Sequence, residues 1–121
     1  MPLLKLHKGM KSLQIEIYDE RVILVTSKRQ VNYLLKHNDF DDDTKRDMIE
    51  CLDYLGACVR LCYGEESYKV MIVLNNSLGT LAHEATHVAD RIMEYRGLEG
   101  TEARAHIVGY VVERFSKGWK K

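Results

Sequence analysis

The sequence predicts an α+β fold in which a small, twisted, mainly antiparallel sheet packs against helices. Segments with strand patterns lie in the first two thirds of the chain, whereas the two longest helical patterns lie at its end. Apolar residues make up 45% of the composition and charged residues 30%, as in an ordinary globular protein. Because 121 residues is the size of one domain, we expect a single domain over residues 1–121.

The chain begins with a predicted hairpin and a short helix. Apolar and polar residues alternate over residues 13–18, which is typical of a strand, and the apolar residues 22–25 predict a second strand. Ser27 has a side chain suited to cap the N-terminus of a helix, which we expect to end at His37. The hairpin is therefore predicted to lead directly into this helix.

A second helix is expected over residues 42–55, after a polar and acidic loop. The acidic run at residues 41–43 is interpreted as the start of this helix, because aspartates suit the positive end of the helix dipole. Gly56 is expected to end the helix. Its predicted buried stripe consists of Met48, Ile49, Leu52 and Leu55.

A second hairpin is predicted where residues 57–63 and 68–74 have strand patterns on either side of the polar turn Gly64-Glu65-Glu66-Ser67. Cys58 and Cys62 are spaced by four residues in the first of these strands, without a second closely spaced pair of cysteines. We therefore interpret the cysteines as reduced core residues rather than as a disulfide framework or a zinc site.

Two helices are expected at the end of the chain. The first is predicted from Leu78 to Arg96, and Gly97 is its expected C-terminal stop. Thr101 is expected to be the N-cap of the second, which runs to about Lys117. This long helical pair is the part of the sequence that carries the chemically informative residues.

Charge and hydropathy exclude several classes of protein. Lys and Arg number 18, and Asp and Glu also number 18, so the formal net charge is zero. Proteins that bind nucleic acids usually have an excess of basic residues, so we expect no nucleic-acid partner. The longest apolar run, residues 70–74, is too short to span a bilayer, and the first residues lack the features of a signal peptide. We therefore expect a cytoplasmic protein that does not associate with membranes.

One motif indicates a specific chemistry: His83-Glu84-Ala85-Thr86-His87, an HExxH sequence within the first of the two long helices. Residues four apart lie on the same face of a helix, so His83 and His87 are candidate ligands of one Zn²⁺ ion. Glu84 is the candidate general base, which would take a proton from a water held beside it. The apolar residues of this helix form a separate stripe, which is predicted to face the core: Leu81, Ala85, Val88 and Ile92.

A third zinc ligand is required, and three residues are candidates. Glu102 opens the last helix, and His106 lies one turn further along the same face. Asp90 lies about one turn after His87 on the motif helix itself, where it could instead orient a ligating histidine. His106 and Tyr110 are also candidate donors to an oxyanion that develops during catalysis.

The expected helix lengths restrict which candidate completes the site. If the motif helix runs straight to Arg96 and the last helix packs antiparallel, Glu102 lies roughly 13 Å from His87 along the axis. Binding by Glu102 then requires that the two helices cross steeply or that the motif helix ends earlier, near Ile92. If neither condition holds, His106 or Asp90 is the better candidate.

These residues resemble the gluzincin class of zinc metallopeptidases, in which HExxH is followed by a Glu on a later helix. The short spacing and small size are most similar to the single-domain minigluzincins and to small HExxH proteins encoded by bacteriophages. In the phage proteins the later helix reads roughly D-E-aromatic-x-A-Tyr, then Gly-Tyr; the counterpart here is Thr101-Glu102-Ala103-Arg104-Ala105-His106, then Gly109-Tyr110. The chain departs from this pattern at Ala103 and His106, and the resemblance spans residues 68–115.

The resemblance implies Zn²⁺ bound by His83, His87 and Glu102, with Glu84 as general base. It also implies a twisted sheet over the motif helix, with the strand at residues 68–74 at the edge of that sheet. An extended peptide or protein substrate could add to this strand through main-chain hydrogen bonds.

The sequence supports two classes of function. The first is a zinc-dependent hydrolase that cleaves a peptide bond in a peptide or protein. The second is a non-catalytic interaction protein or modulator, phage-encoded in one form, that keeps a metallopeptidase scaffold. The presence of Glu84 in the motif favours the hydrolase, because a site that only binds needs no general base.

Overall fold

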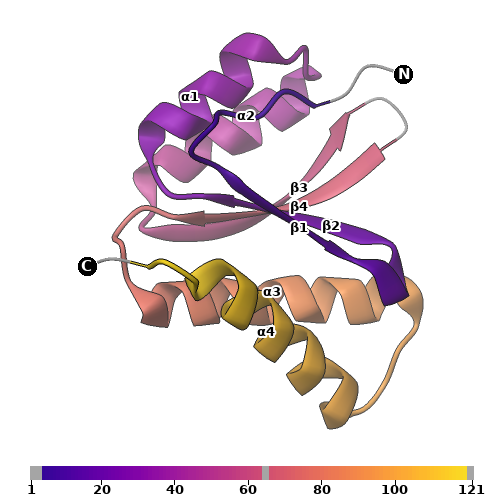
Figure 1. Ribbon diagram of the computed structural model, residues 1–121. Helices are drawn as coiled ribbons and strands as arrows, with labels where there is room; N and C mark the ends of the chain where they lie inside the picture. The colour runs from indigo at the N-terminus through magenta and orange to yellow at the C-terminus, as the bar shows by residue number, and fades with distance from the viewer. Residues whose placement is uncertain (1–3, 64–65, 120–121) are drawn as a thin grey trace.

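The computed structural model describes residues 4–63 and 66–119 and shows a β-sheet with helices on both faces (Figure 1). Short 3₁₀ turns, Glu16–Tyr18 and Cys51–Asp53, follow the first strand and the second helix. In chain order the main elements are β1 (Lys11–Ile15), β2 (Glu20–Val25), α1 (Lys28–His37), α2 (Asp42–Glu50), β3 (Gly56–Tyr63), β4 (Glu66–Val73), α3 (Leu78–Arg96) and α4 (Thr101–Ser116). Within these ranges no helix is both long and apolar enough to cross a membrane.

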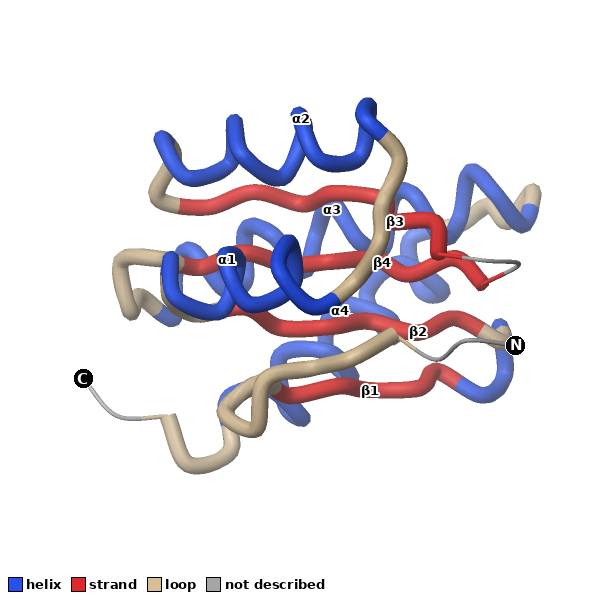
Figure 2. Tube along the Cα trace, turned by 90° about the horizontal axis from the view of Figure 1, so that it is seen from above, coloured by secondary structure: helices blue, strands red, loops and turns tan. Residues whose placement is uncertain are grey.

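The strands lie in the order β1-β2-β4-β3, which Figure 2 shows from the side of α1 and α2. Both predicted hairpins are confirmed, because β1 pairs with β2 and β3 pairs with β4 in antiparallel register. The two hairpins join through the parallel pair of β2 and β4, so the sheet is mixed. The α+β prediction is confirmed, and the sheet is antiparallel in two of its three described pairings. Gly64 and Glu65 of the predicted turn lie outside the described residues.

The predicted position of the strand at residues 68–74 is wrong. We expected it at the edge of the sheet, but β4 is hydrogen-bonded to β2 on one side and to β3 on the other. Its backbone groups are therefore already paired, and no peptide can add to it. The strand at that edge is β3, which among the described strands pairs only with β4.

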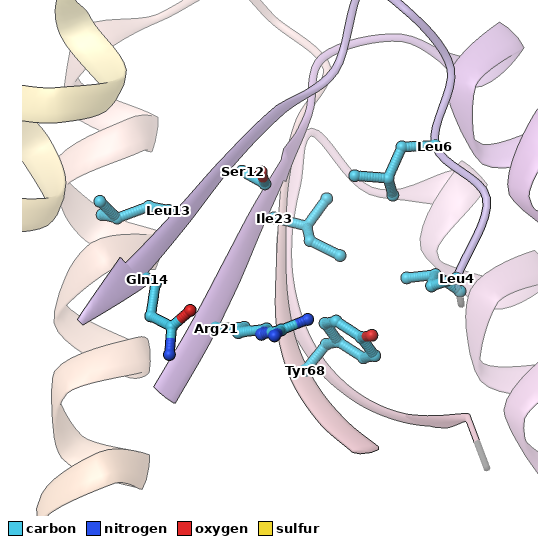
Figure 3. Close-up of a pocket in the computed structure, with 8 residues that line it drawn as sticks. All are labelled: Leu4, Leu6, Ser12, Leu13, Gln14, Arg21, Ile23 and Tyr68. Carbon is cyan, nitrogen blue, oxygen red and sulfur yellow. The ribbon is translucent and has the colours of Figure 1, made fainter. Parts of the chain in front are cut away.

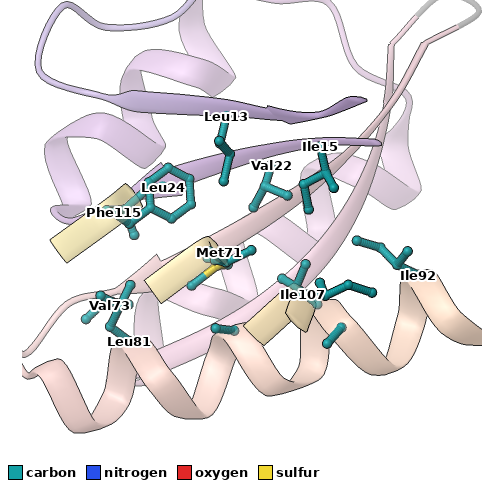
Figure 4. Packing of buried hydrophobic residues seen from close by; sticks show 14 residues of the cluster. Leu13, Ile15, Val22, Leu24, Met71, Val73, Leu81, Ile92, Ile107 and Phe115 are labelled. Carbon is teal, nitrogen blue, oxygen red and sulfur yellow. The ribbon is translucent and has the colours of Figure 1, made fainter. Parts of the chain in front are cut away.

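Helices cover the two faces of the sheet separately: α1 and α2 lie on one face, and α3 and α4 on the other (Figure 1). Each face has its own apolar core. On the face of α3 and α4, side chains of the sheet, α3 and α4 interlock, including Leu24, Met71, Leu81 and Phe115 (Figure 4). Strand residues alternate between the two cores, as the pleat of a strand requires, so Val70 and its neighbours at alternate positions pack under α1 and α2.

Most predicted helix ends are confirmed. The Ser27 side chain accepts a hydrogen bond from the backbone N–H of Gln30, and α1 ends at His37 as expected. The acidic run does start a helix, because the Asp41 side chain caps α2 by accepting from the Thr44 N–H. At the last helix, however, the N-cap is Gly100, with φ of 106°, and Thr101 is the first helical residue.

The second helix is shorter than predicted, and its stripe is only partly buried. It ends at Glu50, and the chain continues through a 3₁₀ turn, so Gly56 starts β3 instead of ending a helix. The Leu55 carbonyl accepts a hydrogen bond from the Leu74 N–H, which holds this residue in an extended connection. Met48 is fully buried as expected, whereas Ile49 is 54% and Leu55 66% exposed.

We predict that Leu81→Ala destabilises the protein far more than Leu55→Ala. Leu81 is fully buried between α3 and the sheet, so its truncation leaves a cavity and costs about 2–5 kcal/mol of unfolding free energy. Leu55 is mostly exposed, and its truncation is expected to change stability by about 0.5 kcal/mol or less. Urea denaturation of the two variants measures the difference, and equal losses would contradict the burial described above.

Candidate metal centre

The HExxH motif lies in α3, and local interactions fix both ends of this helix. The Ser77 side chain caps the first turn by accepting a hydrogen bond from the Thr80 N–H at 3.3 Å. Gly97 ends the helix in the left-handed conformation, with φ of 64°, and the Leu98 N–H donates to the Met93 carbonyl. The helix therefore spans Leu78–Arg96, as the sequence predicts.

The orientation of α3 follows from its apolar stripe. The predicted core residues are all fully buried: Leu81, Ala85, Val88 and Ile92. The helix therefore has only one orientation that buries its apolar surface, and this orientation places His83, His87 and Asp90 on the exposed side. The predicted separation into an apolar face and a histidine-bearing face is confirmed.

The two histidines point toward each other. The distance between His83 Nε2 and His87 Nε2 is 3.2 Å, and the two rings meet edge to face at 79°. Two Zn–N bonds of about 2.0–2.1 Å at a tetrahedral angle place the nitrogens roughly 3.3 Å apart. The pair therefore fits two ligand positions of a zinc ion, and a single metal ion would replace the hydrogen bond between the rings.

Glu84 points in a different direction from the histidines, toward β3. Its side chain is buried, with 5% exposure. The two histidines of the motif, His83 before it and His87 after it in the sequence, are exposed. Burial raises the pKa of the Glu84 carboxyl above its ordinary value, while the charges of the two histidines and of Arg91 act in the opposite direction. A carboxyl in such a site is suited to exchange a proton, because its charged form is not strongly favoured.

Gly56 allows α3 to lie close to the start of β3. A Cβ atom at this first residue of β3 would lie 2.5 Å from Thr80 Cγ2 and 2.8 Å from Glu84 Oε2. The Thr80 hydroxyl is held by a hydrogen bond from the Asn75 side chain, so this residue is not free to turn away. The absence of a side chain at Gly56 therefore sets the position of the Glu84 carboxyl against the edge strand.

The structure brings His83 and His87 together, and none of the described residues lies beside them as a third ligand. Among the described residues, no group of three or more His, Cys, Asp or Glu side chains is arranged to hold a metal ion. The motif helix does not end near Ile92, so the early end that would have delivered Glu102 does not occur. Glu102 is exposed in the first turn of α4.

The other two candidate ligands have neighbours of their own. Asp90 accepts a hydrogen bond from Arg104 Nε at 2.6 Å, and this bond holds the pKa of its carboxyl below the ordinary value. His106 and Tyr110 line a pocket of about 280 Å³ with the end of β1, and the lining of this pocket does not include His83, Glu84 or His87. The Tyr110 hydroxyl accepts a hydrogen bond from Arg114.

A groove along β3, which the sequence did not predict, adjoins the motif helix at Arg91, and its described lining does not include His83, Glu84 or His87. A pocket of about 300 Å³ is lined by consecutive β3 residues 57–60, by α2 on one side and by Arg91 of α3 on the other. Successive strand residues point to opposite faces, so a pocket that contacts four in a row lies along the open edge of the strand. Arg91 lies four residues after His87, which is the one sequence signal that connects this groove with the motif.

Figure 3 shows a separate pocket of about 260 Å³, lined by Leu4 and Leu6 of the N-terminal segment and by sheet residues that include Ile23 and Tyr68. Its lining is mostly apolar and contains no His, Cys, Asp or Glu side chain. It therefore offers no ligand for a metal ion, and the chemically suited residues remain those of α3.

Comparisons with protein-family models, with curated proteins and with solved structures give no match to this chain. The assignment of the site therefore depends on the motif and its geometry alone.

We predict that Gly56→Ala destabilises the protein by about 1–3 kcal/mol, because the added methyl group requires α3 and β3 to separate. Gly109 provides a matched control, since a Cβ atom there meets nothing within 4 Å and the residue lies within α4. Gly109→Ala is expected to stabilise by up to about 1 kcal/mol. Thermal and urea denaturation test both variants, and a neutral Gly56→Ala would show that the close contact is absent.

The Cys58 thiol provides a probe of burial beside the groove. Burial raises its pKa to about 11, and the opposing charges of Arg91 and Glu84 act on it in opposite directions. Because only the thiolate reacts, we expect its alkylation by iodoacetamide to increase about tenfold per pH unit between about pH 8 and pH 10. In urea, where the pKa returns toward its ordinary value of 9.0, the rate is expected to level off at lower pH. Peptide mapping identifies the modified residue, and identical native and unfolded profiles would contradict the raised pKa.

Proposed function

We propose that the protein is a zinc-dependent hydrolase, and that it cleaves a peptide bond in a peptide or protein. The observation that carries the proposal is the 3.2 Å separation of His83 Nε2 and His87 Nε2, which suits two ligands of one zinc ion. A zinc ion in this position would supply a Lewis acid and lower the pKa of a water molecule. Burial raises the pKa of the neighbouring Glu84 carboxyl above its ordinary value, which supports a role in taking up a proton.

The roles of the protein groups follow from where they lie. Glu84 is buried next to Gly56, which leaves room for its carboxyl at the boundary between α3 and β3, where we place its role in proton transfer. His83 and His87 are exposed and accessible to an ion from solvent. Glu102 remains our proposed third ligand on the basis of the resemblance, and its binding requires that the first turn of α4 approach the histidines; it forms no hydrogen bond or ion pair with another described residue, whereas Asp90 is engaged by Arg104.

The substrate is proposed to be an extended peptide that adds to β3. This strand forms the described edge of the sheet beside the motif helix, and a groove runs along it. Unpaired N–H and C=O groups of an edge strand bind a peptide as an additional strand. Gly56, the first residue of β3, lies next to Glu84, so a peptide that extends from the groove past Ala57 toward Gly56 would approach this carboxyl.

A non-catalytic interaction protein is the second candidate. It is favoured by the exposure of large apolar side chains where β3 begins, including Tyr54 at 60% and Leu55 at 66%. Exposed apolar side chains beside an open strand are suited to bind another protein. The two functions differ in whether bound peptide is cleaved, so hydrolysis distinguishes them.

We expect purified wild-type protein to contain one zinc ion, and His83→Ala and His87→Ala to lose it. Glu84→Gln is expected to retain zinc, because the proposed ligands are unchanged. Elemental analysis measures these contents, and Glu102→Ala, His106→Ala and Asp90→Ala in the same series identify the third ligand by which of them loses metal. Stoichiometric zinc in both histidine variants would eliminate the proposed site.

We further expect Glu84→Gln to reduce peptide hydrolysis by about 10²–10⁴-fold, the usual contribution of a positioned general base. A peptide library incubated with zinc-loaded wild type and variant, and analysed by mass spectrometry, measures this effect. The same products at the same rate from both proteins would exclude a catalytic role for Glu84. Retained zinc without cleavage by the wild type would favour the interaction protein.

A further inference from the structure

Positive charge is concentrated where the last turns of α3 meet the sheet. A pocket of about 210 Å³ in this region, here called the basic pocket, is lined by Arg60, Lys69, Arg91, Glu94 and Tyr95. Arg60 and Arg91 also line the groove along β3, so the basic pocket adjoins the groove in which we place the peptide. The side chains come from three elements, β3, β4 and α3, that are distant in sequence.

Two of these cations are direct neighbours across the sheet. Arg60 of β3 and Lys69 of β4 are partners in the antiparallel register. Both approach the Tyr95 ring, with Arg60 Cζ 6.0 Å and Lys69 Nζ 5.7 Å from its centroid. Like charges directly opposite each other destabilise a sheet, and an aromatic face offsets this only in part. An anion between them would remove the repulsion.

Lys69 also retains hydrogen-bonding capacity. It is only 4% exposed, and its ammonium donates to Glu20 Oε1 at 3.0 Å. An ammonium group has three N–H donors, and among the described residues Glu20 is its one hydrogen-bond acceptor. Arg96 donates to the second oxygen of Glu20 at 3.2 Å, so two cations share one carboxylate.

Arg91 adds a further positive charge to the basic pocket. It is exposed and forms no ion pair with any other described residue. The residues that line the basic pocket carry three positive charges, on Arg60, Lys69 and Arg91, and one negative charge, on Glu94, which is a net charge of +2. The adjoining groove also contains the acids Asp47 and Glu50, so the excess of positive charge belongs to the basic pocket and not to the groove.

We propose that the basic pocket binds a carboxylate of the peptide substrate, either an acidic side chain or the C-terminal carboxylate. This proposal rests on the proposed function, because the peptide in the groove along β3 presents the carboxylate to Arg60 and Arg91. Planar guanidinium groups bind carboxylates through paired hydrogen bonds. Glu94 at the same pocket disfavours a more highly charged group such as a phosphate monoester, and Tyr95, 64% exposed, provides an apolar surface for the adjoining methylene groups.

Binding of short probes tests the proposal. The probes are acetyl-Ala-Ala-Ala-Glu-amide, its Gln analogue, and acetyl-Ala-Ala-Ala-Ala with a free C-terminus or a C-terminal amide. Titrations followed by NMR at the side-chain Nε–H groups of arginine report Kd for each probe. We expect the Glu probe, the free-carboxylate probe, or both to bind at least about fivefold more tightly than the matched neutral probe, as charge-assisted hydrogen bonds predict. Which of the two binds identifies the source of the carboxylate.

Charge variants give effects of opposite sign. Arg91→Gln is expected to weaken binding of the preferred acidic probe at least about fivefold, and Glu94→Gln is expected to strengthen it. Arg29→Gln, on the exposed surface of α1, removes the same charge elsewhere and is expected to leave Kd unchanged. Both Arg91 and Glu94 are exposed, and circular dichroism verifies that the variants remain folded.

Equal affinity for acidic and neutral probes, or the same Kd in Arg91→Gln as in Arg29→Gln, would overturn the proposal. These measurements detect binding whether or not the probe is cleaved. Mass spectrometry of the same samples records hydrolysis separately. If binding depends on Arg91 but no probe is hydrolysed, the carboxylate-binding role of the basic pocket is supported and the proposed hydrolase activity is contradicted. If a probe is hydrolysed but its binding does not depend on Arg91, the hydrolase is supported and the role of the basic pocket is contradicted.

Discussion

The burial of one face of α3 is the constraint on which the rest of the molecule depends. Its apolar stripe is fully buried between the sheet and α4, and rotation of the helix would bring these side chains into water. Each buried aliphatic side chain contributes about 1.5–3 kcal/mol, so the orientation is firmly set. Every other property of α3 follows from it, including which residues face the edge strand and which face solvent.

Three features follow along this single helix. The histidine pair lies on the exposed side, Glu84 lies against Gly56 at the start of β3, and Arg91 and Tyr95 lie near the later residues of the same strand. The groove along the open edge of β3 meets this helix at Arg91 and is lined on its other side by α2. The orientation of α3 thus places all three features, although the described residues that line the groove and the basic pocket include Arg91 and not His83, Glu84 or His87.

Sequence patterns succeeded where the determining interactions are local. The Ser77 cap and the Gly97 stop define α3 within a few residues, and side-chain capping likewise starts α1 and α2. Sequence patterns failed where contacts between distant segments determine the local structure. The apolar residues after Glu50 fit a helical stripe, but the hydrogen bond between Leu55 and Leu74 draws the chain into an extended connection that leaves Leu55 exposed. Similarly, the strand at residues 68–74 has a strongly apolar pattern because it is central, and only the pairing with β2 shows this.

The sequence by itself determined the α+β class, the helix that carries the motif, and the side of that helix on which His83 and His87 lie, because helical periodicity alone places residues four apart together. Only the tertiary structure decided that β3 is the edge strand, that Glu84 is buried against Gly56, and that Arg60, Lys69 and Arg91 converge. Each of these depends on how strands and helices from separate parts of the chain pack together. No local pattern records the order of strands in a sheet, since that order is set by the sum of many contacts between distant residues.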